Sequence, residues 1–190
     1  MNPRKHRPRR SAREAVLDAA ALLFAENPGA SMAALAEAAG VGRATLYRYF
    51  PTREALVREL ALEAIERTDA AVAPILARDS NSEEALLGML EAIVPLGDRY
   101  HFLTTERIDD PEVVEQTQRQ ARETAELVEH AKREGLFAAE LPTAWIVATL
   151  EALIWAAWAT VREGAVAPRD AASLAFRTLT RGLGPEPSKA

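Results

Sequence analysis

Residues 43–50, with the sequence RATLYRYF, place side chains that recognise nucleic acids within two turns of a predicted helix. At about 100° per residue, Leu46 and Phe50 fall on one side of that helix, and Ala44 and Arg48 fall on the other. An arginine can contact guanine, small side chains can pack on a thymine methyl group, and tyrosine hydroxyls can donate to phosphates. The pattern predicts a DNA-reading face made by Arg43, Ala44, Thr45, Tyr47, Arg48 and Tyr49. The alternative is an ordinary surface helix with a few aromatic side chains.

Side chains that could support an enzyme or a metal site have simpler explanations in this sequence. Glu126, His130 and Glu134 share one helix face, but neighbouring glutamate–arginine pairs four residues apart indicate a solvated, ion-paired surface. Asp109 and Asp110 precede a proline, as expected for the cap of a helix. The chain has no cysteine, no glycine-rich phosphate loop, no nucleophile motif and no metal-binding signature. We therefore predict neither catalysis, nor a cofactor, nor a metal.

Helix-capping signals indicate the elements that would position the reading face. Ser11 and Glu14 have the spacing of a capping box, so a helix begins after Ser11. Ser31 can cap a second, short helix, which Gly40 ends with a left-handed residue. The third helix carries the reading face and stops at Pro51. Two short helices joined by a glycine turn, with a longer helix in front, form a helix-turn-helix.

The remainder of the chain also predicts helices, so the expected fold class is all-α with about nine helices. Roughly one residue in five is alanine, which has the highest helix propensity. Caps, prolines and glycines give the ranges 52–73, which Pro74 ends or kinks, 82–94, 98–107, 110–135, 142–164 and 168–182.

The charge is divided unevenly along the chain. The net charge of −5 over 190 residues separates into +4 for residues 1–50 and −9 for the remainder. A basic head on an acidic body suggests that the head faces nucleic acid, although a basic tail on an acidic globule would give the same numbers. The arginines of residues 4–10 can follow a DNA backbone or simply keep the chain soluble.

Two features argue against export and against a membrane. Residues 1–10 are polar and basic, unlike a signal peptide. Residues 143–161 are long enough to cross a bilayer, but they carry Glu151 at their centre, where a charge is costly. We expect a cytoplasmic protein without a membrane partner.

Residues 31–56, SMAALAEAAGVGRATLYRYFPTREAL, closely resemble the signature of the TetR family of bacterial transcriptional regulators. The predicted helix layout resembles that family along the whole chain. The resemblance implies that residues 43–49 contact DNA and that Ser31 and Arg53 touch phosphates. One position departs from the pattern, because the family commonly has serine or threonine where this chain has Gly42. The chain therefore lacks a hydroxyl that could cap the recognition helix or contact the DNA backbone.

The predicted helix at 142–164 is apolar nearly all round, so one of its sides needs a partner beyond the domain core. Pairing it and the last helix with their symmetry mates would give a four-helix homodimer interface, which the resemblance also implies. Two recognition helices could then read the half-sites of a near-palindromic operator on double-stranded DNA. The alternative is that Trp155 and Trp158 line an internal cavity. The candidate interface residues are Val147, Trp155, Trp158, Arg162, Leu174 and Phe176.

The resemblance further implies a small-molecule effector that binds in the body and changes the separation of the heads. Residues 98–107 have a weak helical pattern and mix polar with aromatic groups, which suits a pocket wall. The acidic body favours a cationic ligand, although acidity also serves solubility. The candidate ligand-binding residues are Tyr100, His101, Phe102, Thr105, Trp145 and Glu151.

These expectations divide the chain into four regions. They are a flexible basic arm (1–10), a helix-turn-helix DNA-binding domain (11–51), a helical effector-binding and dimerisation domain (52–183) and a disordered tail (184–190). The predicted function is a transcriptional repressor that an effector releases from its operator. A helical protein-interaction module that does not bind DNA is the alternative.

Overall fold

The computed structural model of the protein describes residues 11–78 and 80–184, and within them it contains no strand. This confirms the predicted all-α fold. The predicted basic arm and the tail beyond residue 184 lie outside the described residues. Two short 3₁₀ segments, η1 (Val94–Leu96) and η2 (His101–Thr105), lie on either side of α6. The α-helices are α1 (Ala12–Glu26), α2 (Met32–Ala38), α3 (Arg43–Tyr49), α4 (Arg53–Leu76), α5 (Ser82–Ile93), α6 (Gly97–Tyr100), α7 (Pro111–Arg133), α8 (Thr143–Arg162) and α9 (Pro168–Leu183).

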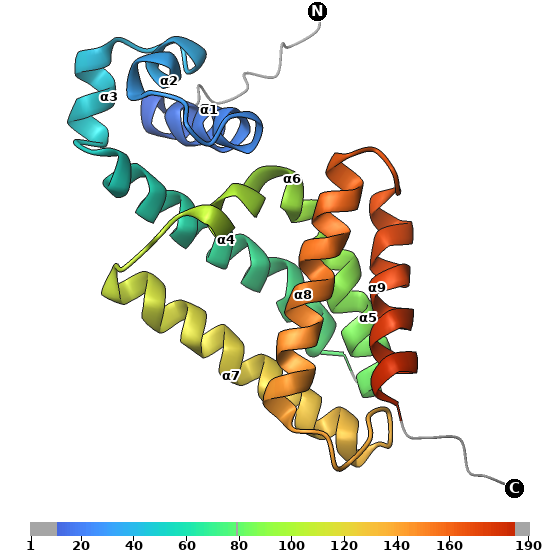
Figure 1. The fold of residues 1–190 in the computed structure, drawn as a ribbon. Coiled ribbons are helices and arrows are strands. Elements are labelled where there is room, and N and C mark those ends of the chain that lie inside the picture. Colours follow the sequence, from blue (N-terminus) through green and yellow to red (C-terminus); the bar gives the residue numbers. More distant parts are fainter. Residues whose placement is uncertain (1–10, 79, 185–190) are drawn as a thin grey trace, which may run out of the picture.

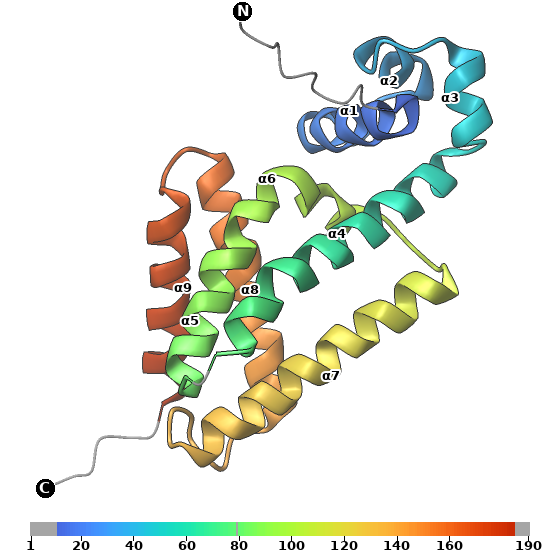
Figure 2. The same ribbon diagram turned by 180° about the vertical axis from the view of Figure 1, so that it is seen from behind.

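The helices form a small head and a larger body (Figure 1). Helices α1, α2 and α3 gather at one end of the molecule, and α4 runs from them into the body. Helices α8 and α9 lie side by side along one flank of the body, with α5 against α9 and α7 against α8. The view from behind shows α4 and α5 crossing the body between α7 and the α8–α9 pair (Figure 2).

The hydrogen bonds that cap the head helices match the sequence prediction. The amide of Glu14 donates to Ser11 Oγ at 3.2 Å, and the amide of Ser11 donates back to Glu14 Oε2 at 2.9 Å, which completes the capping box. Thr52 caps α4 by accepting from the amide of Ala55 at 3.1 Å. Gly40 has a φ of +65°, so it ends α2 in the left-handed conformation that glycine adopts without strain.

The body helices differ from the prediction at three places. Helix α4 continues through Pro74 to Leu76, because the proline lies in the last turn and costs only the bond to the exposed Ala70. Helix α9 includes Gly182 and ends at Leu183. The single helix expected at 98–107 is two short pieces, α6 and η2, which meet at residues 100–101.

Two separate hydrophobic cores hold the molecule together. The head core joins α1, α2 and α3, with Phe24, Leu35, Leu46 and Phe50 among its fully buried side chains. The body core joins α5, α7, α8 and α9 around buried residues such as Leu86, Leu90, Val128, Ile146, Leu150 and Leu179. Burial of this kind is the main favourable term in folding.

The head core extends beyond the predicted domain boundary at residue 51. Leu56 and Leu60, on the first two turns of α4, are fully buried in it. Phe102 of η2 also belongs to it, with its ring centre 5.6 Å from that of Phe24. Further along α4, Val72 packs against the body core. The two cores therefore share one continuous helix.

Replacing Gly97 tests how tightly α8 packs on α6. Gly97 has an ordinary helical φ of −59°, but a Cβ there would collide with the indole of Trp158. We expect Gly97→Ala to lower the free energy of unfolding by about 1–3 kcal/mol, as overpacking does. Gly182→Ala is the matched control, because nothing lies within 4 Å of its added methyl and removing a helical glycine stabilises by roughly 0.5–1 kcal/mol. Urea denaturation followed by circular dichroism measures both, and equal effects would contradict the expectation.

Candidate nucleic-acid interface

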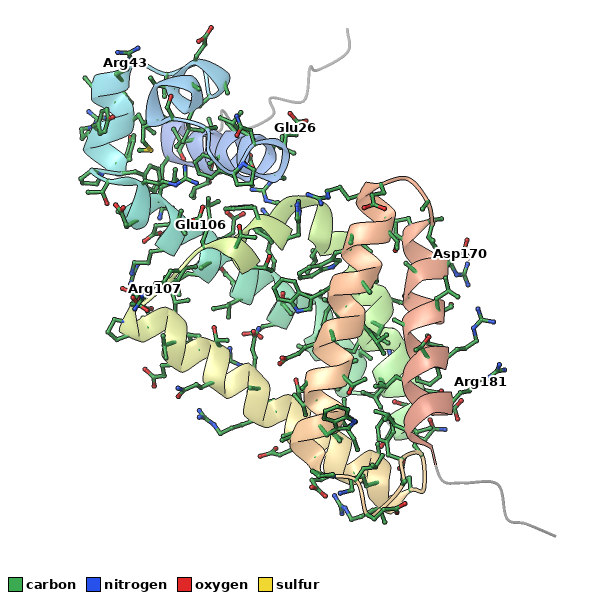
Figure 3. All side chains as sticks on the ribbon, viewed as in Figure 1. Glu26, Arg43, Glu106, Arg107, Asp170 and Arg181 are labelled. Carbon is green, nitrogen blue, oxygen red and sulfur yellow. The ribbon has the colours of Figure 1, made fainter. Side chains whose placement is uncertain are left out.

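The side chains of α3 divide into a buried set and an exposed set. Leu46 and Phe50 lie in the head core and hold the helix against α1. The opposite face is open, and Figure 3 shows Arg43 at the outer end of the head, away from the body helices. The exposed side chains are Arg43, Ala44, Tyr47, Arg48 and Tyr49, with Thr45 half-buried.

Arg48 contacts its neighbour Tyr49. Its Cζ atom lies 5.0 Å from the centre of the Tyr49 ring, and its Nη2 donates to the Tyr49 hydroxyl at 3.3 Å. This cation–π contact covers one face of the guanidinium and leaves its other donors unused among the described contacts. The pair thus presents a pre-oriented arginine on the exposed face of α3.

The two short helices of the head begin differently. Ser31 is exposed and caps α2 by accepting from the amide of Ala34 at 3.2 Å, so its own hydroxyl hydrogen remains free to donate outwards. Gly42 caps α3 with an ordinary φ of −67° and without a side-chain hydrogen bond. A Cβ at Gly42 would meet nothing within 4 Å. The backbone there would accept a serine, so glycine is not required by the geometry.

Arg53 is directed into the protein, unlike the other predicted DNA-contacting residues. Its Nη1 donates to the carbonyl of Ala30 at 3.0 Å, and its Nη2 donates to the carbonyl of Pro28 at 2.6 Å and to Glu106 Oε1 at 2.7 Å. Its Cζ atom also lies 4.1 Å from the centre of the Phe24 ring. The side chain is 28% exposed.

Comparison with known proteins identifies the family. Residues 16–60 match the model of bacterial regulatory proteins of the tetR family. The HTH-type transcriptional repressor LfrR of Mycolicibacterium smegmatis is 32% identical over 165 residues, which cover 82% of each chain. The protein belongs to the TetR family. It is therefore a transcriptional regulator and not an enzyme, as the sequence predicted.

Solved structures of TetR-family proteins have the same fold along most of the chain. LfrR from Mycobacterium smegmatis, crystallised with proflavine, has a TM-score of 0.78 at 28% identity and covers 90% of this chain and 96% of its own. The ketosteroid regulator KstR2 of Mycobacterium tuberculosis has a TM-score of 0.73 at 20% identity, with 94% and 97% covered. TetR-family regulators bind DNA and form dimers.

The body of this TetR-family regulator contains a cavity of about 190 Å³ between α4, α5, α7 and α8. Its walls are mainly apolar and include Val72, Met89, Ile93 and Leu127. Carboxylates and amides from α4, α7 and α8 interrupt these walls. A mainly apolar cavity with a few polar groups is typical of a small-molecule site.

Glu151 is the one predicted pocket residue that lines this cavity, and the other five lie elsewhere among the described residues. Trp145 is 61% exposed near the start of α8. Phe102 is buried in the head core, where packing against Phe24 accounts for it. Thr105 is exposed, and its hydroxyl donates to the carbonyl of Phe102 at 2.8 Å.

Tyr100 and His101 make polar contacts outside this cavity. The buried hydroxyl of Tyr100 accepts from Nε of Arg99 at 3.0 Å, and burial raises its pKa. Arg99 also binds Asp18 of α1 at 2.6 Å. The Nε2 atom of His101 lies 2.7 Å from Nη1 of Arg162 on α8. His101 thus joins η2 to α8, while Arg99, the neighbour of Tyr100, joins α6 to α1.

The sequence prediction missed the polar side chains that α4 and α7 bring to the cavity. Asp69 Oδ1 accepts from the side-chain amide of Gln120 at 2.7 Å, and Asp69 Oδ2 accepts from Nη2 of Arg119 at 2.5 Å. The hydrogen bonds to Asp69 and then to Glu123 raise the pKa of Arg119. A signal existed, because Thr117, Gln120 and Thr124 recur at helical spacing on one face of α7. Polar residues on the inward face of a helix predict that this face borders a cavity with polar groups in its wall.

The predicted interface residues on α8 and α9 have different environments. Trp155 and Leu174 are 46% and 43% exposed and point away from the body core. A surface groove lies between the packed helices α8 and α9 and is lined by Ala156, Leu174 and Thr178 among others. Trp158 packs over Gly97, and its indole N–H lies 3.4 Å from the carbonyl of Ile93.

The remaining predicted interface residues make contacts within the protomer. Phe176 is buried in the body core, and the partly buried Val147 packs against that core. Arg162 is exposed but bonds to His101. The prediction of Phe176 as an interface residue is therefore wrong, because a buried side chain cannot contact a second copy.

Helix α8 has the length and apolarity of a membrane span, with a mean hydropathy of 1.6 over its most apolar window. Only 17% of that window is buried in the protomer. An apolar helix with so much uncovered surface calls for a further partner.

Proposed function

We propose that this TetR-family regulator is a homodimeric cytoplasmic repressor that binds a near-palindromic operator and is released from it by a small molecule. The division of α3 into a buried apolar side and an exposed polar side carries this proposal. Residues 11–51 read DNA, and residues 52–183 bind the effector and dimerise. The DNA-contacting set is Ser31, Arg43, Ala44, Thr45, Tyr47, Arg48 and Tyr49.

Dimerisation through α8 and α9 would cover the uncovered apolar surface of α8. Trp155 of α8 and Leu174 of α9 supply large exposed side chains. The exposed alanines of α8, Ala152, Ala156 and Ala159, allow close approach of a second copy. A two-fold axis along these helices would present two α3 faces to one side of a duplex. Half-sites about 34 Å apart, one turn of DNA, follow from that symmetry.

The cavity between α4, α5, α7 and α8 suits an apolar molecule that carries positive charge. Asp69 and Glu123 share the guanidinium of Arg119, which balances one of their two negative charges and leaves the other in place. Glu151 has no hydrogen bond or ion pair among the described contacts, and it can balance a ligand cation. The related LfrR binds proflavine, an aromatic cation, in its crystal structure. A ligand that prefers one separation of the heads would thereby weaken operator binding.

Replacing Arg48 tests the reading face. An operator is first selected from a random DNA pool with the unaltered protein, and affinities are then measured by electrophoretic shift. We expect Arg48→Ala to weaken operator binding by about 1–3 kcal/mol per half-site, because a base contact is lost. Arg122→Ala, an equal change of charge on the exposed side of α7, should bind normally. Failure of the unaltered protein to bind any DNA would refute the proposed operator binding and would favour a protein-interaction module.

Replacing Leu174 tests the dimer. We expect Leu174→Glu to give monomers in sedimentation velocity, because two carboxylates would be brought into an apolar contact. Leu22→Glu is the matched control, since Leu22 is 62% exposed on α1, away from α8 and α9, and this variant should remain dimeric. A dimeric Leu174→Glu would show that the copies associate through another surface.

Replacing Glu151 tests the effector cavity, with proflavine as the probe. Glu151→Gln keeps the shape of the side chain and removes its charge, so we expect proflavine affinity to fall about tenfold, or roughly 1.4 kcal/mol. Glu140→Gln, in the exposed segment between α7 and α8, should leave that affinity unchanged. Proflavine should also lower the operator affinity of the unaltered protein. Equal proflavine affinity in the two variants, measured by calorimetry, would contradict a role for Glu151.

A further inference from the structure

Glu106, the carboxylate that binds Arg53, directly follows η2, a segment that contacts both the head and α8. On the head side, Phe102 packs against Phe24 in the head core. On the body side, His101 bonds to Arg162 of α8 at 2.7 Å. The Arg53–Glu106 ion pair, at 2.7 Å, therefore connects the start of α4 to a segment that is attached to α8.

A second ion pair joins the same turns of α4 to α7. Arg58 Nε donates to Asp110 Oδ2 at 2.9 Å, and Asp110 also caps α7 by accepting from the amide of Val113 at 3.2 Å. Partial burial raises the pKa of Asp110, but the hydrogen bonds from Val113 and Arg58 outweigh it, so the pKa lies below its usual value. The carboxylate thus stays charged at neutral pH.

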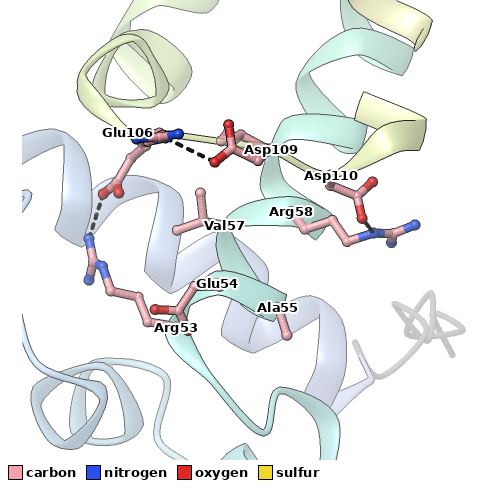
Figure 4. Close-up of a pocket in the computed structure, with 10 residues that line it drawn as sticks. Arg53, Glu54, Ala55, Val57, Arg58, Glu106, Asp109 and Asp110 are labelled. Carbon is pink, nitrogen blue, oxygen red and sulfur yellow. Dashed lines mark hydrogen bonds and ion pairs between the residues drawn. The ribbon is translucent and has the colours of Figure 1, made fainter. Parts of the chain in front are cut away.

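The two ion pairs lie on opposite sides of a cavity of about 490 Å³, with Val57 between them (Figure 4). Arg107, at the edge of this cavity, pairs with Asp109 at 2.9 Å. The guanidinium groups that line the cavity are thus all paired with carboxylates. The pairs of Arg53 and Arg58 join α4 to the segment before α7, whereas the Arg107–Asp109 pair is local to that segment. The cavity therefore offers no unpaired guanidinium to an anionic ligand.

The geometry points to Arg53 as a positioning residue that sets the angle of the DNA-reading head through Glu106, in place of a contact with a DNA phosphate. This inference rests on the DNA binding proposed above. It assigns to Arg53 and Glu106 a role in the spacing of the two α3 faces.

Competition between acceptors favours the internal contacts of Arg53. Turning the guanidinium towards DNA would leave the carbonyls of Pro28 and Ala30 and the carboxylate of Glu106 without a donor. Pro28 is exposed, so water can replace its donor, but Ala30 is buried and Glu106 is only 23% exposed, so water replaces the other two bonds poorly. A phosphate would offer one exposed ion pair in return, and the nearby carboxylate would repel it.

The consequence concerns the separation of the half-sites. In a dimer built on α8, the path of contacts from α8 through Arg162, His101 and Glu106 to Arg53 sets the position of each head together with α4 and the Phe24–Phe102 packing. Loss of that path should let each head move relative to the dimer interface. The protein would then tolerate operators whose half-sites are one base pair closer together or farther apart.

The experiment uses the full chain and the operator selected from a random pool, together with versions of that operator shortened and lengthened by one base pair. Affinity is measured over a series of salt concentrations for the unaltered protein and for Glu106→Ala, Arg53→Ala and Arg53→Lys. The lysine variant keeps the charge for a phosphate contact but cannot bond to three acceptors in the plane of a guanidinium. Thermal denaturation shows whether each variant folds.

A positioning role predicts the same phenotype for all three variants. Each should lose about tenfold in affinity for the selected operator, bind the altered spacings within about threefold of it, and keep the salt slope of the unaltered protein. The double variant Arg53→Ala with Glu106→Ala should lose no more than either single variant, because both changes break one path.

A phosphate contact predicts a different set of results, any of which would overturn the inference. Arg53→Ala would flatten the salt slope by about 0.9 per contact, or about 1.8 per dimer, while Arg53→Lys would preserve slope and affinity. Glu106→Ala would bind DNA more tightly, because a competing carboxylate is gone. A fall in melting temperature with unchanged spacing preference would assign the pair a purely structural role. None of these results would contradict the proposed function as a DNA-binding repressor. Absence of DNA binding by the unaltered protein would overturn both that proposal and the role of Arg53.

Discussion

Helix α4 buries its first two turns in the head core and packs its later turns against the body, and this shared helix constrains the rest of the structure. Leu56 and Leu60 belong to the head, while Val72 belongs to the body. An α-helix transmits displacement because its backbone hydrogen bonds make it stiff along its length. Any change in how the body packs on the later turns therefore reaches the head.

The segment between α6 and α7 adds a second connection between the two parts. Phe102 extends the head core, and Arg99 joins α6 to Asp18 of the head by a hydrogen bond of 2.6 Å. Glu106 and Asp110 then pair with arginines of α4. Part of the acidic surplus of the body is thus used at the junction. The head keeps its exposed arginines on α3, on the side remote from these carboxylates.

Much of the head could be predicted from the sequence because its determinants are local. The capping box at Ser11, the cap at Ser31 and the left-handed Gly40 each depend on a few neighbouring residues, and the structure has all three. The burial of Leu46 and Phe50 follows from helical periodicity alone. The boundary at Pro74 differs from the prediction because a proline near a helix end costs little when the freed carbonyl is exposed.

The sequence by itself determined the fold class, the family and which side of α3 faces outwards, since these depend on composition, local spacing and a contiguous signature. Only the tertiary structure decided the contacts of Arg53 and Phe102 and the walls of the body cavity. The contacts of Arg53 and Phe102 join residues 23 to 78 positions apart along the chain. No local pattern distinguishes an arginine that awaits a phosphate from one that already holds a carboxylate, because the partner is chosen by the packing of distant segments.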